Sequence, residues 1–204
     1  YDPRQVGEAL WPNKYPVERL NVIRKQLGSR NWSSLYQSSP IIVGGNIIKE
    51  EWIQYYDKLP FDLTNHRSHR LITSWDLSFK ETGKSYVVGG CNFYLIDIYR
   101  KKAGMGESLR AIQAMAKKYP KCRSILVEDK ANGSGVIDLL RGKVPITPVT
   151  PEVSKDERLH SVEPIFEAGN FFLPVAHPER DNIVQELISF PMSVTDDIVD
   201  AISQ

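Results

Sequence analysis

The sequence predicts a mixed α/β fold, in which three leading strands are followed by alternating helices and strands. Three β-prone runs, over residues 71–75, 85–88 and 93–99, follow one another along the chain. The Gly-rich stretch between the second and third runs predicts a tight connection, so we expect these strands to be antiparallel. Beyond residue 104, helical and extended patterns alternate, which is typical of strands joined by helices in one sheet.

The first part of the chain reads as a lead-in to this sheet. Apolar side chains at helical spacing predict a helix over residues 17–27, and Gly28 then supplies a helix stop. Residues 49–56 predict a short helical or extended segment. We therefore expect a linker segment over residues 1–67 and a compact domain over residues 68–204.

The alternating part contains a helix with one apolar face, a short buried strand, and further helical and extended segments. These are the helix marked by Leu109, Ile112, Met115 and Ala116 and closed by Pro120, the strand over 124–127, the helix over 136–140, the extended run over 144–149, the helix over 158–168 and a last helix over 196–204. This order continues the three leading strands into one mixed sheet, whose ligands are expected at the carboxyl ends of the strands.

Composition predicts an ordinary globular protein without a global charge signal. Lys and Arg total 26 against 25 Asp and Glu, so the net charge is +1 and any DNA contact must come from a local basic patch. Cys91 and Cys122 form no closely spaced metal-ligand pair, and both fall in apolar stretches, as expected for buried free thiols in a reducing compartment. The sequence has neither a membrane-spanning apolar run nor a signal-peptide layout. Because it lacks an initiator Met and stops inside a predicted helix, we expect it to be part of a longer protein.

Acidic residues stand where this fold would gather them. Asp76 and Glu128 each follow an apolar β-run directly, so adjacent parallel strands would bring both carboxylates to one sheet edge. In the last helix, Asp196 and Asp200 are four residues apart and Asp197 and Asp200 three apart, which puts acids on one helical face. One end of that helix could complete the cluster.

Carboxylates held a few ångströms apart repel one another, so a cluster of them requires a cation. Hard oxygen ligands indicate Mg²⁺ or Mn²⁺, and two such ions are the usual arrangement for hydrolysing a phosphodiester. Taken singly, each acid is as readily explained as a turn cap, a helix N-cap or a solvated charge. It is the joint placement of the acids that favours a metal site.

Two other motifs do not carry a function. Gly83, Lys84 and Ser85 look like the end of a phosphate-binding loop, but Ser78 stands where that motif needs its first Gly and no helix follows. His66 and His69 have no Cys or further His nearby and are flanked by arginines, which disfavours a zinc site.

Three acidic motifs resemble those of the nuclease domain of bacteriophage large terminase subunits. They are the runs SWD at 74–76, VEDKANG at 127–133 and DDIVDA at 196–201. The lead-in runs at 7–12, 35–40 and 44–45 resemble the stretch that joins the terminase motor ATPase to its nuclease. The resemblance thus covers nearly the whole chain.

This resemblance implies an RNase H-like fold and divalent-metal-dependent endonuclease action on double-stranded DNA. Asp76 matches the first acid, Glu128 the second and Asp197 the third, with Asp196 and Asp200 as companion metal ligands. Many members of the family carry His where this chain has Thr195, which argues against a His-assisted metal site.

The resemblance also implies partners and a setting. Concatemeric viral DNA would be cut during genome packaging in the host cell cytoplasm, with an upstream motor ATPase domain, a small terminase subunit and a portal protein as partners and no membrane involved. The alternative is an RNase H-like docking module for the portal or a partner subunit that binds metal without cutting. The near-neutral charge predicts weak DNA binding that falls steeply with salt.

Several basic residues are candidate DNA contacts, although solvated charges would look the same in sequence. Lys130, two residues past Glu128, would lie either near the metals or in solvent. The remaining candidates are Lys155 and Arg158 on one face of a short helix, and Arg100, Lys101 and Lys102 at a predicted hairpin tip.

Overall fold

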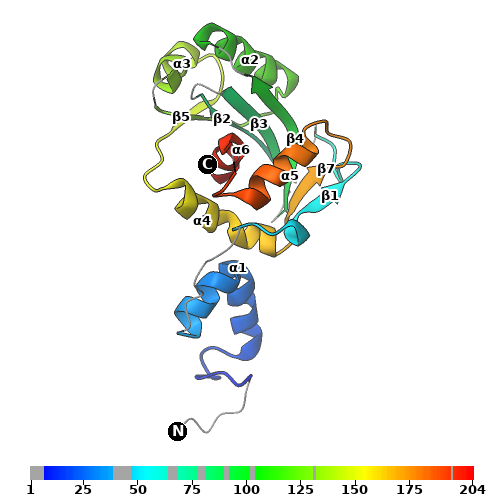
Figure 1. Cartoon of the computed structure of the whole chain (residues 1–204), viewed down its shortest axis with the longest axis vertical. Coiled ribbons are helices and arrows are strands. Elements are labelled where there is room, and N and C mark those ends of the chain that lie inside the picture. The colour runs from blue at the N-terminus through cyan, green and yellow to red at the C-terminus, as the bar shows by residue number, and fades with distance from the viewer. Residues whose placement is uncertain are drawn as a thin grey trace.

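The computed structural model describes residues 7–38, 47–63, 69–77, 81–89, 92–101, 104–130, 132–193 and 195–204, with only the backbone path described for 81–89 and 132. Its centre is one seven-stranded sheet in the order β1-β7-β4-β3-β2-β5-β6 (Figure 1). The strands are β1 (Gln54–Tyr56), β2 (His69–Asp76), β3 (Glu81–Gly89), β4 (Asn92–Lys101), β5 (Ser124–Glu128), β6 (Ile146–Val149) and β7 (Phe171–Pro174).

Helices cover both faces of the sheet. The covering helices are α2 (Met105–Lys118), α3 (Asn132–Leu140), α4 (Lys155–Glu167), α5 (Arg180–Ser189) and α6 (Asp197–Ser203). Helix α1 (Val17–Tyr36) packs on α4 instead, and η1 (Glu50–Trp52) is a short 3-10 turn. Figure 1 shows α2 and α3 together at one end of the molecule, α4, α5 and α6 grouped elsewhere over the sheet, and α1 extending away from α4 toward the N-terminus.

The predicted mixed sheet is confirmed. Strands β2, β3 and β4 pair antiparallel in chain order, and β5 and β6 continue the sheet parallel to β2. On the other edge, β7 and β1 add parallel to β4. All the parallel strands therefore end on the same edge of the sheet, which is where the predicted acids lie.

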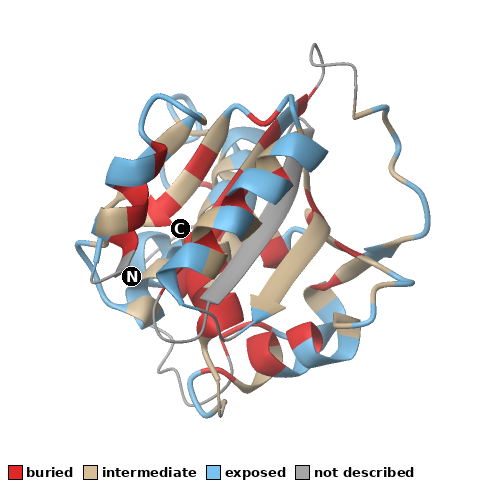
Figure 2. Ribbon diagram, turned by 90° about the horizontal axis from the view of Figure 1, so that it is seen from above, coloured by how far each residue is buried: buried red, intermediate tan, exposed pale blue. Residues whose placement is uncertain are grey.

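Alternation of side chains along the strands produces two hydrophobic cores. Trp75 and Val127 point to one face and pack with Ile112 and Met115 of α2. On the opposite face, Leu95 packs in the core formed with α4, α5 and α6. Figure 2 shows the consequence, with buried residues along strands and inward helix sides and exposed residues on the outer surfaces. The sheet thus separates the two cores, and the face opposite α2 is covered by α6.

Helix α1 is broken at the predicted stop but does not end there. Gly28 has φ 72° and ψ 164°, and the chain turns helical again as far as Tyr36. The second half begins at Ser29, whose backbone N–H donates to Glu167 of α4 at 2.7 Å. A carboxylate from another helix thus satisfies an amide that a helix start leaves unpaired, so helix formation resumes beyond the glycine.

Two elements went unpredicted, and several predicted ones differ in detail. Strand β7 and helix α5 were not predicted, although both pack in the core under α6. Helix α4 begins at Lys155 rather than near residue 158, because Ser154 and Glu157 form a reciprocal capping box. The segment expected as helical or extended contains both, η1 and then β1.

The boundary near residue 67 stays a prediction. Ile48 and Ile53, which precede it, are buried in the core beside α4, α5 and α6, and β1 belongs to the same sheet. Among the described residues, no helix combines the length and the apolar character needed to cross a membrane.

Candidate functional site

The ends of β2 and β5 bring two predicted acids to neighbouring positions. Trp75 and Val127 are register partners in this parallel pair, so one further step places Asp76 beside Glu128. Because Trp75 and Val127 point into the α2 core, Asp76 and Glu128 point to the opposite face. Asp76 is 5% exposed, whereas Glu128 is half-buried. The sheet alone therefore creates a pair of carboxylates on one face.

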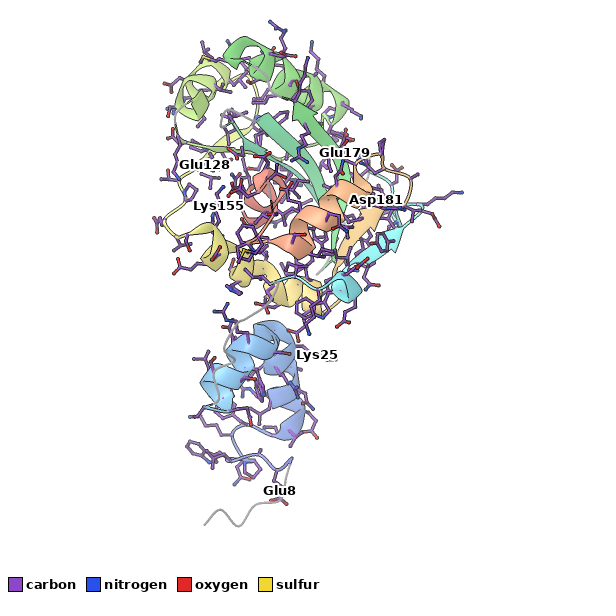
Figure 3. All side chains as sticks on the ribbon, viewed as in Figure 1. Glu8, Lys25, Glu128, Lys155, Glu179 and Asp181 are labelled. Carbon is purple, nitrogen blue, oxygen red and sulfur yellow. The ribbon has the colours of Figure 1, made fainter. Side chains whose placement is uncertain are left out.

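Helix α6 covers the face on which these acids lie. Gln204, just past its end, donates from Nε2 to Glu128 Oε2 at 3.3 Å and accepts from Ser74 Oγ at 2.8 Å. One side chain thus joins the carboxyl end of β5 to β2 and holds both against α6. In Figure 3, Glu128 and Lys155 are labelled on one side of α6, and Glu179 and Asp181 at the start of α5 on the other.

The third predicted acid enters from the first turn of α6. Asp197 is 5% exposed, and its Oδ2 lies 3.4 Å from Nη2 of Arg100 on β4. Register places Asp76, Thr82 and Arg100 in one row across β2, β3 and β4. Adjacent strands are about 4.8 Å apart, so Arg100 starts about 10 Å from Asp76. Asp197 therefore contacts the same row of the sheet edge as Asp76 and Glu128.

A buried glutamate lies beside Asp197 and Arg100, and it was not predicted from the sequence. Glu186 of α5 is 4% exposed and accepts hydrogen bonds from Arg100 Nη2 at 3.1 Å, from Thr195 Oγ1 at 2.7 Å, and from the backbone N–H of Ile198. Thr195 therefore serves here as a hydrogen-bond donor to a carboxylate.

The other two acids of α6 turn toward α4. Asp196 accepts from Lys155 Nζ at 2.6 Å, and Asp200 accepts from Arg158 Nη2 at 2.6 Å and also pairs with Lys155. Burial lowers the pKa of Lys155, but the hydrogen bonds and charges of Asp196 and Asp200 outweigh burial, so the net effect is a raised pKa. The predicted DNA contacts Lys155 and Arg158 thus hold α6 through ion pairs.

The other predicted DNA contacts that the structure describes lie near the acidic edge or at the end of β4. Lys130 Nζ is 3.0 Å from Glu128 Oε1, which places it at the acidic edge rather than in solvent alone. Lys101 pairs with Glu107 of α2. Arg100 and Lys101 are at the open end of the β3–β4 hairpin, so their prediction as a hairpin tip is wrong, while Lys102 lies outside the described residues.

The carboxylates suit a hard divalent cation by their donor chemistry, and their arrangement suits one in part. Asp76 and Glu128 share a face, and Asp197 lies over the same row. However, within the described part of the chain no three His, Cys, Asp or Glu side chains lie close enough to hold a metal ion. The sequence predicts acids crowded enough to demand a metal, whereas in the structure lysine or arginine pairs with Glu128, Asp196, Asp197 and Asp200.

A weak signal for the missed glutamate is present in the sequence. Ile183, Val184 and Leu187 recur at helical spacing and are buried. That pattern predicts a helix but does not say that Glu186, between apolar neighbours, points inward. Its role depends on α6 packing against α5, which only the fold establishes.

Of the remaining motifs, the Gly83–Ser85 run and Cys122 agree with their structural interpretation. Gly83, Lys84 and Ser85 are part of the continuous strand β3, which a phosphate-binding loop would not be. His69 is buried at the start of β2 and stacks on Phe61 with ring centroids 4.6 Å apart. Burial raises the pKa of the Cys122 thiol, while His66 and Cys91 lie outside the described residues.

Comparisons with solved structures identify where this fold occurs. No model of a known protein family matches the sequence, and no curated protein matches it. The nuclease of the large terminase from thermophilic phage G20c, with bound cobalt, is 14% identical with a TM-score of 0.61, covering 79% of this chain and 96% of that one. The same nuclease with bound magnesium is 13% identical with a TM-score of 0.60, covering 79% and 96%.

A longer structure extends the likeness toward the lead-in. The large terminase from a second thermophilic bacteriophage, in complex with ADP, is 11% identical with a TM-score of 0.69, covering 91% of this chain. The chain spans about half the length of that protein, 50%. At these identities the likeness shows the fold, which is RNase H-like, and confirms at that level the resemblance to terminase nuclease domains.

Proposed function

We propose that this chain is the nuclease part of a viral large terminase, a divalent-metal-dependent endonuclease that cuts concatemeric double-stranded DNA during packaging. The observation that carries the proposal is the placement of Asp76 and Glu128 side by side on the face that α6 covers with Asp197. The bound cobalt, zinc and magnesium in the G20c nuclease support the use of a divalent ion.

Each acidic residue has a specific part in this proposal. Asp76, Glu128 and Asp197 would hold Mg²⁺ or Mn²⁺, with Asp196 and Asp200 as companions. Two bound ions would activate the attacking water and neutralise charge that builds on the phosphate. Arg100 lies beside Asp197 and Lys130 beside Glu128, so a bound ion would have to compete with these cations for the two carboxylates.

The wider assembly is part of the same proposal. The partners would be double-stranded DNA, a motor ATPase domain upstream in the same polypeptide, a small terminase subunit and a portal protein, in the host cell cytoplasm. The longer large terminase in complex with ADP, half of whose length this chain covers, supports a nucleotide-binding partner domain.

A plasmid-nicking assay with Mn²⁺ or Mg²⁺ tests the activity. We expect the wild-type chain to convert supercoiled plasmid to nicked and linear forms, and Asp76→Asn and Glu128→Gln to lower the rate at least about a hundredfold, because each removes a charge that the metal needs. Asp138→Asn is the matched control, since Asp138 is 76% exposed and pairs only with Arg141 among the described residues.

The result decides between two functions. Equal rates for wild type and Asp76→Asn with either metal would sink the nuclease proposal. An RNase H-like docking module would then be the better account, and the lysine and arginine partners of the acids would favour it.

A further inference from the structure

Glu186 is a buried charge whose oxygens face the start of α6. Its three donors come from three elements: Arg100 at the end of β4, Thr195 in the loop before α6, and the backbone N–H of Ile198 in the first turn of α6. At 4% exposure, a carboxylate is costly to bury unless its oxygens accept hydrogen bonds. The three donors supply those hydrogen bonds.

We infer that Glu186 is a positioning residue for the proposed nuclease reaction, which places Asp197 by capping α6 and by restraining Arg100. The residue at the N-cap of α6, Asp196, makes no side-chain cap hydrogen bond and pairs with Lys155 instead. Glu186 supplies the missing cap from α5. Its negative charge is also favourable beside a helix N-terminus.

The second role follows from the geometry of Arg100. Its Nη2 lies 3.1 Å from Glu186 and 3.4 Å from Asp197, so one nitrogen is shared between two buried carboxylates. Glu186 therefore competes with Asp197 for this cation. Without the charge of Glu186, Arg100 would pair with Asp197 alone and oppose cation binding there more strongly.

The inference rests on the proposed function, and one arm of its test does not need activity. In the metal-free 204-residue chain, we expect the Ile198 amide to exchange with solvent at least about tenfold faster in Glu186→Ala than in wild type. Protection at β2 should be unchanged. Unchanged exchange at Ile198 would overturn the capping role, whether or not the protein cuts DNA.

A second arm measures Mn²⁺ binding by electron paramagnetic resonance. Glu186→Gln keeps the shape of the side chain but removes its charge, so we expect half-saturation to require several-fold more Mn²⁺. Combining Glu186→Gln with Arg100→Gln should reverse much of that increase, because the competing cation is gone. A shift in Glu186→Gln that persists in the double variant would overturn the role assigned to Arg100.

The third arm is kinetic and separates positioning from general stability. At saturating Mn²⁺, Glu186→Gln should lower kcat for nicking about tenfold with KM for DNA unchanged, and Glu186→Asp, which retains the charge, should recover part of the loss. Asp181→Asn is the control on the same helix, because Asp181 is 82% exposed. Equal loss in Glu186→Gln and Glu186→Asp would overturn the inference. If the wild-type chain does not nick DNA, the proposed function is lost, but the hydrogen-exchange measurement still tests the capping role of Glu186.

Discussion

Each of the two acids that α6 directs toward α4 is matched with a cation. Asp200 is 3% exposed and forms an ion pair with Arg158, whose own side chain is 11% exposed. The Nε and Nη1 atoms of Arg158 are buried and have no hydrogen-bond partner among the described residues. Two charges removed from water are costly, so their mutual attraction must offset that desolvation. The pair is therefore sensitive to the loss of either member.

Replacing Arg158 by Met should destabilise the fold. Breaking a buried pair costs about 3–5 kcal/mol, but the change leaves Lys155 beside Asp200, so we expect a somewhat smaller loss of about 2–4 kcal/mol in the free energy of unfolding. Urea denaturation followed by circular dichroism measures it.

The control is an exposed pair of the same chemistry. Arg141 and Asp138 are 71% and 76% exposed, so Arg141→Met should cost less than about 1 kcal/mol. If the two variants lose equal stability, the ion pair between α4 and α6 is not a buried contact in solution.

The contribution of Lys155 should persist at neutral pH. Its raised pKa means that its stabilisation is present below the unfolded value and is lost only as pH rises through the folded one.

At the scale of elements, the first turn of α3 packs very close to the backbone at the end of β5. A Cβ added at Gly133, in the first turn of α3, would lie 1.9 Å from the backbone oxygen of Glu128. No rotamer change can relieve contact with a backbone atom, so any side chain here must push α3 away from β5. Gly133 thereby fixes where Glu128 sits.

We expect Gly133→Ala to lower both stability and nicking activity. The substitution gains up to about 1 kcal/mol of helix propensity, but the clash should exceed that gain and cost about 1–3 kcal/mol net, as other overpacking changes do. Thermal unfolding and the plasmid assay measure the two effects.

Gly135→Ala is a matched control in the same helix. Its added Cβ would meet the end of the Met105 side chain, with the methyl at 2.5 Å and the sulfur at 3.7 Å, and this flexible side chain can move aside. This variant should be neutral or slightly stabilising. Equal losses in the two alanine variants would show that α3 does not restrain Glu128.

An element could be predicted from sequence when its own residues carry a clear apolar pattern. The strands before Asp76 and Glu128 are apolar runs that end in an acid, so both the strands and the shared edge could be inferred locally. Strand β7 has four residues and α5 has ten, and each is defined mainly by packing under α6. A four-residue strand is too short to show a period, and the helical spacing in α5 is limited to Ile183, Val184 and Leu187.

The site was predictable to the same extent. Sequence indicates that Asp196, Asp197 and Asp200 share one helix, but not that Asp197 faces Arg100 while Asp200 faces Arg158. That division depends on the rotation of α6 against β4 and α4. The cation partners and the capping by Glu186 are tertiary contacts, so no local pattern contained them.

At the scale of the whole molecule, the basic residues nearest the acidic edge are engaged in ion pairs within the chain. The net charge is +1. Of the predicted DNA contacts that the structure describes, every one has an acidic partner: Arg100, Lys101, Lys130, Lys155 and Arg158. Contacts to phosphate must then replace existing ion pairs, which reduces what each contributes to binding.

Weak, salt-sensitive DNA binding is therefore expected of the isolated chain. For a labelled duplex followed by fluorescence anisotropy in Ca²⁺, chosen to limit cutting, the Kd should be micromolar or weaker near physiological salt, as for sequence-independent binding. It should rise at least about tenfold between roughly 50 and 200 mM salt, and two duplexes of unrelated sequence should bind alike, since phosphate contacts carry no sequence information. Nanomolar binding that is insensitive to salt would contradict this expectation. In the proposed assembly, weak binding means that the motor must bring DNA to Asp76 and Glu128. Cutting would then depend on DNA that a partner holds at the site. Translocation could proceed because the nuclease alone does not retain the DNA.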